Sequence, residues 1–136
     1  GAVLVPGSKA PKLIDREMMR VMKKGSVFVD IAIDQGGCAE TSRPTTHHDP
    51  IYVEEDVTHY CVANMPAAFA RTSTQALTNV TYRYIETLAD HGVPGAFKRD
   101  PNLLSGMNLF DGKVTHHAVA EAHGMEFFDF KAASGL

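Results

Sequence analysis

The stretch "VDIAIDQGGC", residues 29–38, decides the fold because an apolar run passes directly into an acid, an amide and two glycines. The predicted strand begins at residue 26, and the near-continuous apolar character from residue 27 is typical of a parallel strand that is covered on both faces. Open α/β folds keep their ligands at the carboxyl ends of such strands. We therefore expect a strand over residues 26–33 with Asp34 at its functional end.

The residues before this stretch predict a parallel sheet. Residues 2–5, "AVLV", are a short apolar run that ends at a Pro-Gly turn, which indicates a buried strand. Apolar residues then recur at helical spacing between residues 11 and 25, and the segment ends in Lys-Lys-Gly, a favourable helix terminus. A strand, a helix and a second strand form one βαβ unit, whose crossover is expected to be right-handed.

A third strand is predicted over residues 57–63, followed directly by Asn64. Between the second and third strands, residues 35–56 hold two prolines and two glycines and show no helical period. They predict a long loop with a short extended piece at residues 51–53, and loops of this length are usually functional or disordered.

The C-terminal half is predicted to be mainly helical. The sequence "TSTQ" has the spacing of a capping box, and apolar residues line one face from there, which predicts a long helix over residues 72–91. His91, Gly92 and Pro94 are expected to stop it. Turns at "GAFKRDPN" and "FDGK" and a helix over residues 115–123 follow.

Composition narrows the class of protein. The 136 residues are 44% apolar, carry a formal charge of −3, and contain no large cluster of Lys or Arg, so nucleic acid is not expected as a partner. No apolar run approaches the roughly 20 residues of a membrane span. Cys38 and Cys61 fit no disulfide or CxxC pattern, which predicts plain thiols in a cytoplasmic protein. A first residue that is Gly within a strand-like run suggests that an N-terminal part is missing.

Asp34 and Asn64 are the leading candidates for chemistry, since each follows a predicted strand. Asp34 either faces a ligand or accepts hydrogen bonds from the amides of its own turn. Asn64 likewise either faces the same ligand or caps the next helix. Two such residues on neighbouring strand ends favour a shared site.

Other polar residues carry weaker signals. His47, His48 and Asp49 cluster in the loop, and His59 and Cys61 face one side of their strand, but the spacing matches no standard ligand set, so no metal is expected. Arg43 is either an anion ligand or a solvated loop charge. The dinucleotide fingerprint GxGxxG is absent, so any phosphate-binding turn must lie outside these residues.

Three segments, "GAVLVPGSKAPKLI", "DIAIDQGGCAETSRPTTHHDP" and "YCVANMPAAFARTSTQALTN", together resemble the C-terminal part of the alanine dehydrogenase and pyridine nucleotide transhydrogenase family. The resemblance covers essentially the whole chain and is closest to the bacterial alanine dehydrogenases. It implies an α/β fold: residues 1–70 would be the second half of a Rossmann-type parallel sheet that binds NAD. Residues 71–136 would be a long linking helix and the C-terminal return segment of the substrate domain.

The resemblance also implies site residues and a reaction. Asp34 would be the catalytic aspartate beside the nicotinamide. The positions that line the cofactor would be Val3, Leu4, Ile31, Ala32, Ile33, Asp34, Arg43, Val62, Ala63, Asn64 and Met65. The implied reaction is the reversible NAD-dependent oxidative deamination of L-alanine to pyruvate and ammonia. Departures from the family pattern at Ala67 and Ala70 alter the turn into the long helix and leave these assignments intact.

Several consequences and alternatives accompany this resemblance. The family's catalytic histidine and its substrate-binding lysine and arginine belong to an N-terminal domain, so this chain alone is expected to be inactive. Family members assemble into hexamers, so a homo-oligomer is expected. A transhydrogenase-like nucleotide-binding domain is the nearest enzymatic alternative. A fragment that supports oligomerisation without activity of its own is the alternative from a different class.

Overall fold

A computed structural model describes residues 1–134 of the 136. The chain divides into two compact units, Gly1–Ala70 and Arg71–Leu136. The first contains a mixed sheet with a parallel strand pair, and the second contains a long helix. The predicted α/β class is confirmed.

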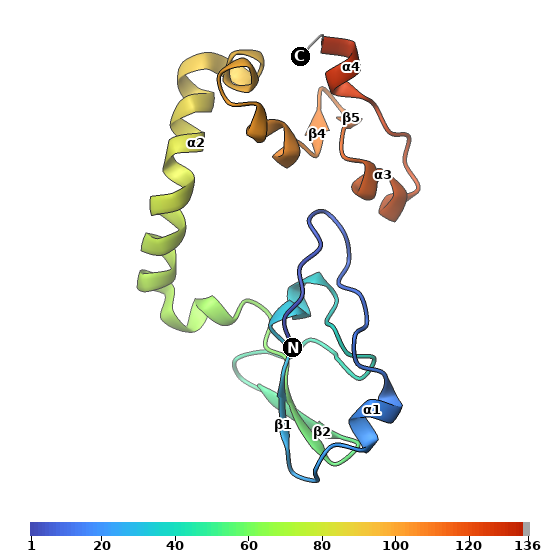
Figure 1. The fold of residues 1–136 in the computed structure, drawn as a ribbon. Helices are drawn as coiled ribbons and strands as arrows, with labels where there is room; N and C mark the ends of the chain where they lie inside the picture. The colour runs from blue at the N-terminus through green and yellow to red at the C-terminus, as the bar shows by residue number, and fades with distance from the viewer. Residues whose placement is uncertain (135–136) are drawn as a thin grey trace. The chain divides into compact units, whose positions relative to one another are not determined.

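The sheet of the first unit has the strand order β1-β3-β2, with β1 at Val27–Val29, β2 at Ile51–Glu54 and β3 at Val57–Tyr60 (Figure 1). β1 pairs with β3 in parallel, as the sequence predicted, and the register places Phe28 opposite His59. β2 pairs with β3 antiparallel, so the extended piece expected at residues 51–53 is a full edge strand.

A two-residue turn joins β2 to β3. Glu55 and Asp56 both have positive φ, 51° and 59°, and they lie between the paired residues Glu54 and Val57. This is the backbone requirement of a type I′ turn, whose twist matches that of two antiparallel strands.

The strand predicted at residues 2–5 is wrong. Gly1 alone pairs with the edge of β1: its N–H donates to the Val29 carbonyl at 2.5 Å, and its carbonyl accepts the Ile31 N–H at 2.9 Å. These two bonds make a single step of parallel pairing. Residues 2–5 carry no strand because no other described strand lies against them to extend the ladder.

The strand predicted over residues 26–33 ends earlier than expected. The Asp30 side chain accepts the Ala32 N–H at 3.0 Å and begins a 3₁₀ helix, η1, at Ile31–Gln35. A side-chain acceptor at this position competes with the sheet for the backbone N–H, so the ladder stops at Val29.

The first helix is also shorter than predicted. α1 spans Arg16–Arg20, and Asp15 caps it by accepting the Met18 N–H at 2.7 Å. The residues before it are extended instead, since Leu13 N–H donates to the Cys38 carbonyl at 2.7 Å. Leu13 is 55% exposed, so the apolar spacing of this segment does not mark the buried face of a helix.

Two groups of buried residues form the core of the first unit. The larger one contains Ala10, Met19, Phe28, Ala32, Cys38, Ala39 and Val57. The smaller one contains Ile33, Tyr52 and Cys61. Both cysteines are free and buried, in agreement with the prediction of plain thiols.

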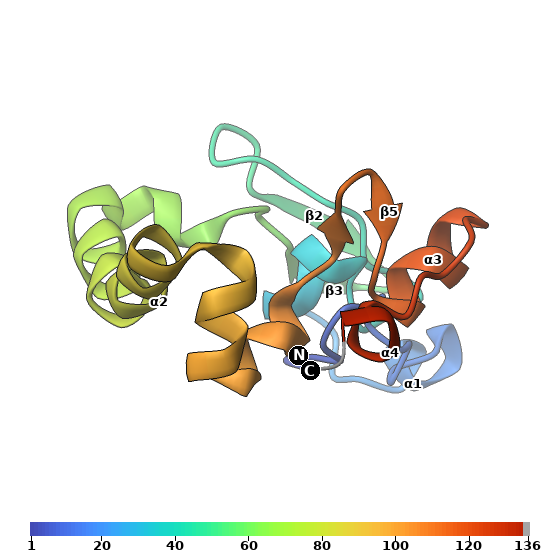
Figure 2. The same cartoon turned by 90° about the horizontal axis from the view of Figure 1, so that it is seen from above.

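After η2 (Met65–Phe69), the long helix α2 spans Ala70–Arg99 (Figures 1 and 2). Gly92 has non-helical dihedrals, φ 62° and ψ 175°, and the helix changes direction there. The predicted stop near residues 91–94 is therefore a kink, and the expected turn after Gly95 begins only at Asp100, which caps η3 (Pro101–Gly106).

The remainder of the second unit consists of short elements. β4 (Leu109–Phe110) and β5 (Lys113–Val114) form a hairpin whose turn is the predicted "FDGK". α3 spans His117–His123, within the predicted range, and α4 spans Phe130–Ser134. Across residues 1–134, no helix combines the length and the apolar character needed to cross a membrane.

Candidate functional site

The ends of β1 and β3 bring Asp34 and Asn64 together. The backbone N–H of Asn64 lies 3.1 Å from Oδ1 and 3.3 Å from Oδ2 of Asp34. Parallel neighbours end at the same edge of a sheet, so the two segments that follow them meet. Both residues are exposed, which leaves the carboxylate accessible from solvent.

The backbone of Asn64 is in the left-handed region, with φ 53° and ψ 52°. Its side chain makes no capping bond to η2, so the interpretation of Asn64 as a side-chain helix cap is wrong. The Asp34 carboxylate accepts a hydrogen bond from the Asn64 N–H, which follows the neighbouring strand. Asp34 therefore does more than accept hydrogen bonds from the amides of its own turn. Asn tolerates the left-handed region better than most residues with a Cβ.

The glycine pair after Asp34 makes a turn that a lysine closes. Gly36 and Gly37 have φ of 101° and 74°, values that strongly favour glycine. The Lys12 Nζ donates to their carbonyls at 2.7 Å and 2.9 Å. This contact links the segment before α1 to the site.

Asp30 is a buried residue that sequence reasoning missed. Its Oδ2 accepts from the Cys38 N–H at 2.8 Å and from the Ser42 hydroxyl at 2.5 Å. Burial alone would raise the pKa of this carboxyl, but the bonds from Ser42 and Cys38 outweigh burial and hold the pKa below its ordinary value. An acid inside the apolar run "VFVDIAI" was the available signal.

Four of the predicted cofactor-lining residues share one hollow of about 450 Å³ in the first unit. Its lining consists of Ala2, Val3, Leu4, Ile31, Ala32 and Gln35. Leu4 and Ile31 are 70% and 62% exposed, so the hollow presents open apolar surface. Gln35 was not predicted, although it directly follows Asp34.

Other predicted residues do not reach this hollow with their side chains. Ile33 packs in the smaller core cluster, and Val62 is fully buried. Ala63 is exposed and Met65 is half-buried beside Asn64. Ile33 and Val62 can therefore contribute to a ligand site through their backbone alone.

Tyr52 holds Arg43 in place. The Tyr52 hydroxyl accepts the Arg43 N–H at 3.0 Å and donates to the Thr41 carbonyl at 2.7 Å, while the Arg43 guanidinium carbon lies 3.9 Å from the Tyr52 ring centroid. Burial, reinforced by the neighbouring Cys61 thiol, raises the pKa of Tyr52. Arg43 is thus exposed but anchored, and it does not line the hollow.

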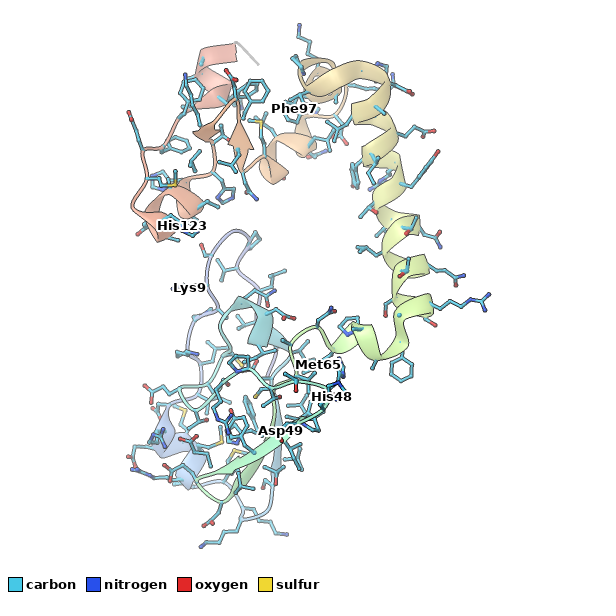
Figure 3. All side chains as sticks on the ribbon, turned by 180° about the vertical axis from the view of Figure 1, so that it is seen from behind. Lys9, His48, Asp49, Met65, Phe97 and His123 are labelled. Atoms are coloured by element: carbon cyan, nitrogen blue, oxygen red, sulfur yellow. The ribbon has the colours of Figure 1, made fainter. Side chains whose placement is uncertain are left out.

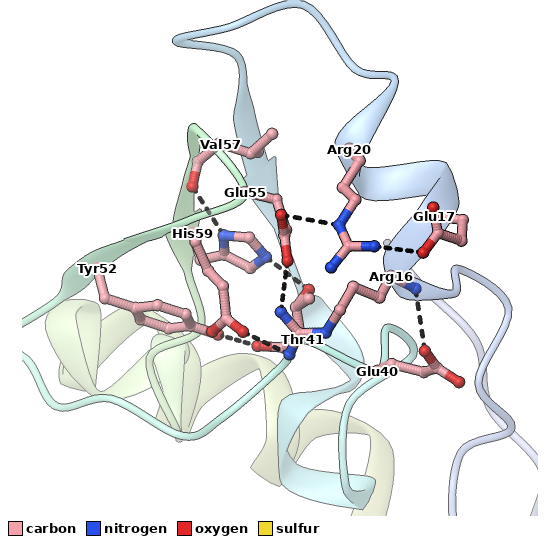
Figure 4. Close-up of polar contacts among 10 residues, drawn as sticks. Arg16, Glu17, Arg20, Glu40, Thr41, Tyr52, Glu55, Val57 and His59 are labelled. Carbon is pink, nitrogen blue, oxygen red and sulfur yellow. Dashed lines mark hydrogen bonds and ion pairs between the residues drawn. The ribbon is translucent and has the colours of Figure 1, made fainter.

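His59 belongs to the core and not to a metal site (Figure 4). Its Nδ1 donates to the Val57 carbonyl at 2.9 Å, and its Nε2 pairs with the Thr41 hydroxyl at 2.8 Å. Its ring stacks on Tyr52 with centroids 4.8 Å apart. Within residues 1–134, no three His, Cys, Asp or Glu side chains cluster in a way that could hold a metal ion.

Ion pairs connect α1 to the β2–β3 turn (Figure 4). Arg16 lies 2.6 Å from both Glu54 and Glu55, and Arg20 lies 3.1 Å from Glu55. Hydrogen bonds from Arg16 and Arg20 lower the pKa of Glu55. These groups are partly exposed, so they orient α1 more than they stabilise it.

Comparison with known proteins decides the family. The family model "Alanine dehydrogenase/PNT, C-terminal domain" matches residues 1–117. The chain belongs to this family. It is 58% identical over 135 residues to an alanine dehydrogenase of Halomonas elongata, with 99% of this chain and 36% of that protein covered. An alanine dehydrogenase of Staphylococcus haemolyticus is 56% identical over 128 residues, with 93% and 34% covered.

Solved structures agree with this membership of the alanine dehydrogenase/PNT family. An L-alanine dehydrogenase superposes with a TM-score of 0.72 and 45% identity, over 91% of this chain and 34% of that chain. A transhydrogenase from Sinorhizobium meliloti gives 0.55 and 28%, over 66% and 25%. The chain therefore spans about a third of the length of the curated relatives it matches.

Proposed function

We propose that this chain forms part of an NAD-dependent L-alanine dehydrogenase that interconverts L-alanine with pyruvate and ammonia in the cytoplasm. The observation that carries the proposal is the Asp34 carboxylate, fixed by the Asn64 N–H where β1 and β3 end. It lies beside residues that line an apolar hollow, and alanine dehydrogenases are among the relatives above 50% identity.

The two units receive the domain assignments that the family resemblance implies. Residues 1–70 are proposed as the C-terminal half of the NAD-binding domain, and residues 71–136 as the linking helix and the C-terminal part of the substrate domain. The proposed cofactor-lining residues are Val3, Leu4, Ile31, Ala32, Ile33, Asp34, Arg43, Val62, Ala63, Asn64 and Met65.

The residues present fit one end of a dinucleotide. An open apolar hollow suits a planar ring and its ribose, while the absence of GxGxxG means that another segment has to bind the pyrophosphate. NAD, when bound, accepts a hydride from the substrate carbon. Asp34 then stabilises the positive charge that develops on the substrate nitrogen, an interaction that is stronger in the transition state than in the ground state.

The remaining catalytic groups are proposed to come from outside these 136 residues. The family's histidine, lysine and arginine have no counterpart here, so we expect the isolated chain to be inactive. Assembly into a hexamer is part of the same proposal. A transhydrogenase-like function is the second candidate, supported by the superposition on the Sinorhizobium meliloti protein.

The test is carried out on a full-length protein that carries this segment, with intact mass used first to define the chain. Production of NADH from NAD is measured with L-alanine, and with L-serine and glycine as comparison substrates. We expect alanine-dependent NADH formation. Hydride transfer between NADH and an NADP analogue without alanine oxidation would instead support the transhydrogenase candidate.

A further inference from the structure

The long loop after η1 is tied to the end of β3. Thr45 N–H donates to the Cys61 carbonyl at 2.9 Å, and the Thr45 carbonyl accepts the Ala63 N–H at 3.1 Å. These bonds form a parallel bridge between Thr45 and Val62. The loop therefore runs alongside the segment that leads to Asn64, and it brings His47 to that residue.

His47 contacts the backbone of Asn64. Its Nε2 lies 3.2 Å from the Asn64 carbonyl oxygen, and since a carbonyl only accepts, Nε2 must carry the proton. The same carbonyl accepts the Ala67 N–H at 3.0 Å. Figure 3 shows the neighbouring His48 near Met65 on this part of the first unit. Two donors on one oxygen fix the orientation of the peptide after Asn64.

This peptide needs to be held because Asn64 is in the left-handed region, which is unfavourable for a residue with a Cβ. Rotation of Asn64 toward ordinary dihedrals would move both of its peptide groups. The N–H that binds the Asp34 carboxylate belongs to one of them. A contact that keeps Asn64 in place therefore also keeps Asp34 in place.

We infer that His47 is a positioning residue, whose ring N–H holds the left-handed Asn64 and thereby fixes the Asp34 carboxylate. The expected effect of His47 on kcat rests on the proposed function. Its effect on the Asn64 backbone is independent of that function. His47 belongs to the loop cluster whose spacing matches no standard set of metal ligands.

The first experiment needs no activity. Amide hydrogen exchange is measured on the full-length protein, without substrate, for wild type, His47→Leu, His47→Gln and the control His48→Leu. His48 is an exposed neighbour for which the described residues offer no hydrogen-bond or ion-pair partner. Glutamine presents an N–H near the position of Nε2, so it should conserve the contact.

We expect the Asn64 amide to exchange about tenfold faster in His47→Leu, as local opening becomes easier, and at the wild-type rate in the other two variants. His47→Asn, whose amide is too short to reach, replaces the leucine variant if that does not fold. Unchanged exchange at Asn64 in the variants that lack the contact would overturn the inference.

The second experiment measures kcat and KM for L-alanine with NAD. Loss of the contact should lower kcat about tenfold and change KM less than about twofold, since small displacements of a reacting group cost up to about 100-fold in rate. His47→Gln should restore kcat, and His48→Leu should not alter it. Faster exchange with unchanged kcat would refute the positioning role.

The two proposals fail in different ways. A wild-type protein that does not oxidise alanine contradicts the proposed function, and the exchange rates still decide whether His47 holds Asn64. If the wild-type protein oxidises alanine and the Asn64 amide exchanges at the normal rate in His47→Leu, the proposed function stands. His47 then has no positioning role.

Discussion

Gly37 lies directly against the buried carboxylate of Asp30. A Cβ at residue 37 would be 2.9 Å from Asp30 Oδ2 and 2.6 Å from Ser42 Cβ, and φ at this residue is 74°. We expect Gly37→Ala to lower the free energy of unfolding by at least about 2 kcal/mol, from the left-handed backbone together with the overpacking. Urea denaturation of the purified protein measures this change.

Gly36 offers the matched control for this substitution. Its φ is 101°, but a Cβ there would meet nothing within 4 Å. Gly36→Ala should therefore cost about 1 kcal/mol from the backbone alone. Equal losses at the two positions would show that the contact with Asp30 is not tightly packed.

Replacing Asp30 with Asn should destabilise the first unit. An amide nitrogen in place of Oδ2 would face the Cys38 N–H and the Ser42 hydroxyl, so at least one buried donor loses its acceptor. The expected loss is about 1–3 kcal/mol at neutral pH, measured by urea denaturation.

The same residue makes stability depend on pH in a defined direction. The pKa of Asp30 in the folded protein lies below the value of 3.8 expected for the unfolded chain. Its stabilisation is therefore complete above that value and is lost as the pH falls through the lower, folded value. The difference in unfolding free energy between wild type and Asp30→Asn should shrink at acid pH. A difference that is constant from pH 7 down to strongly acid pH would contradict this assignment.

Asp34→Asn tests the proposed catalytic role in the full-length enzyme. The substitution keeps the shape and removes the charge, so kcat for alanine oxidation should fall about 10² to 10³-fold with little change in Tm. A carboxylate with only a structural role predicts the reverse, a loss of about 1 kcal/mol in stability with near-normal turnover. Both quantities are measured on one preparation.

Tyr52→Phe separates the hydroxyl from the ring. The ring can still stack on His59 and lie under Arg43, while the bonds to the Thr41 carbonyl and the Arg43 N–H are lost. We expect a loss of about 1–3 kcal/mol in stability. Tyr60→Phe, in the neighbouring strand, serves as the control. A normal Tm for Tyr52→Phe would mean that water replaces both bonds.

The isolated chain should bind NAD more weakly than about 1 mM, because its sequence lacks the GxGxxG turn that places a helix N-terminus at the pyrophosphate. Isothermal titration measures this affinity. Micromolar binding by residues 1–136 alone would reassign the cofactor-binding residues.

The parallel pairing of β1 with β3 was predictable because near-continuous apolar runs are typical of parallel strands. The meeting of Asp34 with Asn64 follows from that pairing. The strand expected at residues 2–5 failed for a physical reason: a strand needs a ladder, and the local run cannot indicate whether a neighbour is present. In this segment, Gly1 alone pairs with a neighbouring strand, through its hydrogen bonds to Val29 and Ile31.

Side-chain contacts were harder to predict than strand pairing. Asp30 caps η1 and thereby ends β1. In the sequence, it cannot be distinguished from an acid that lies within a strand. The contact of His47 with Asn64 depends on a bridge between Thr45 and Val62, residues that lie 17 positions apart. No local pattern encodes that bridge.

The two free thiols can time the opening of the first unit. Cys38 and Cys61 are 1% and 0% exposed, and each belongs to a different core cluster. Burial and the nearby Asp30 raise the pKa of Cys38, and alkylating reagents attack the thiolate, so modification of this residue requires both exposure and ionisation. Mass spectrometry can follow the alkylation of each cysteine separately. The rate at Cys38 would report opening of the core packed against α1, and the rate at Cys61 would report opening of the core packed against β2.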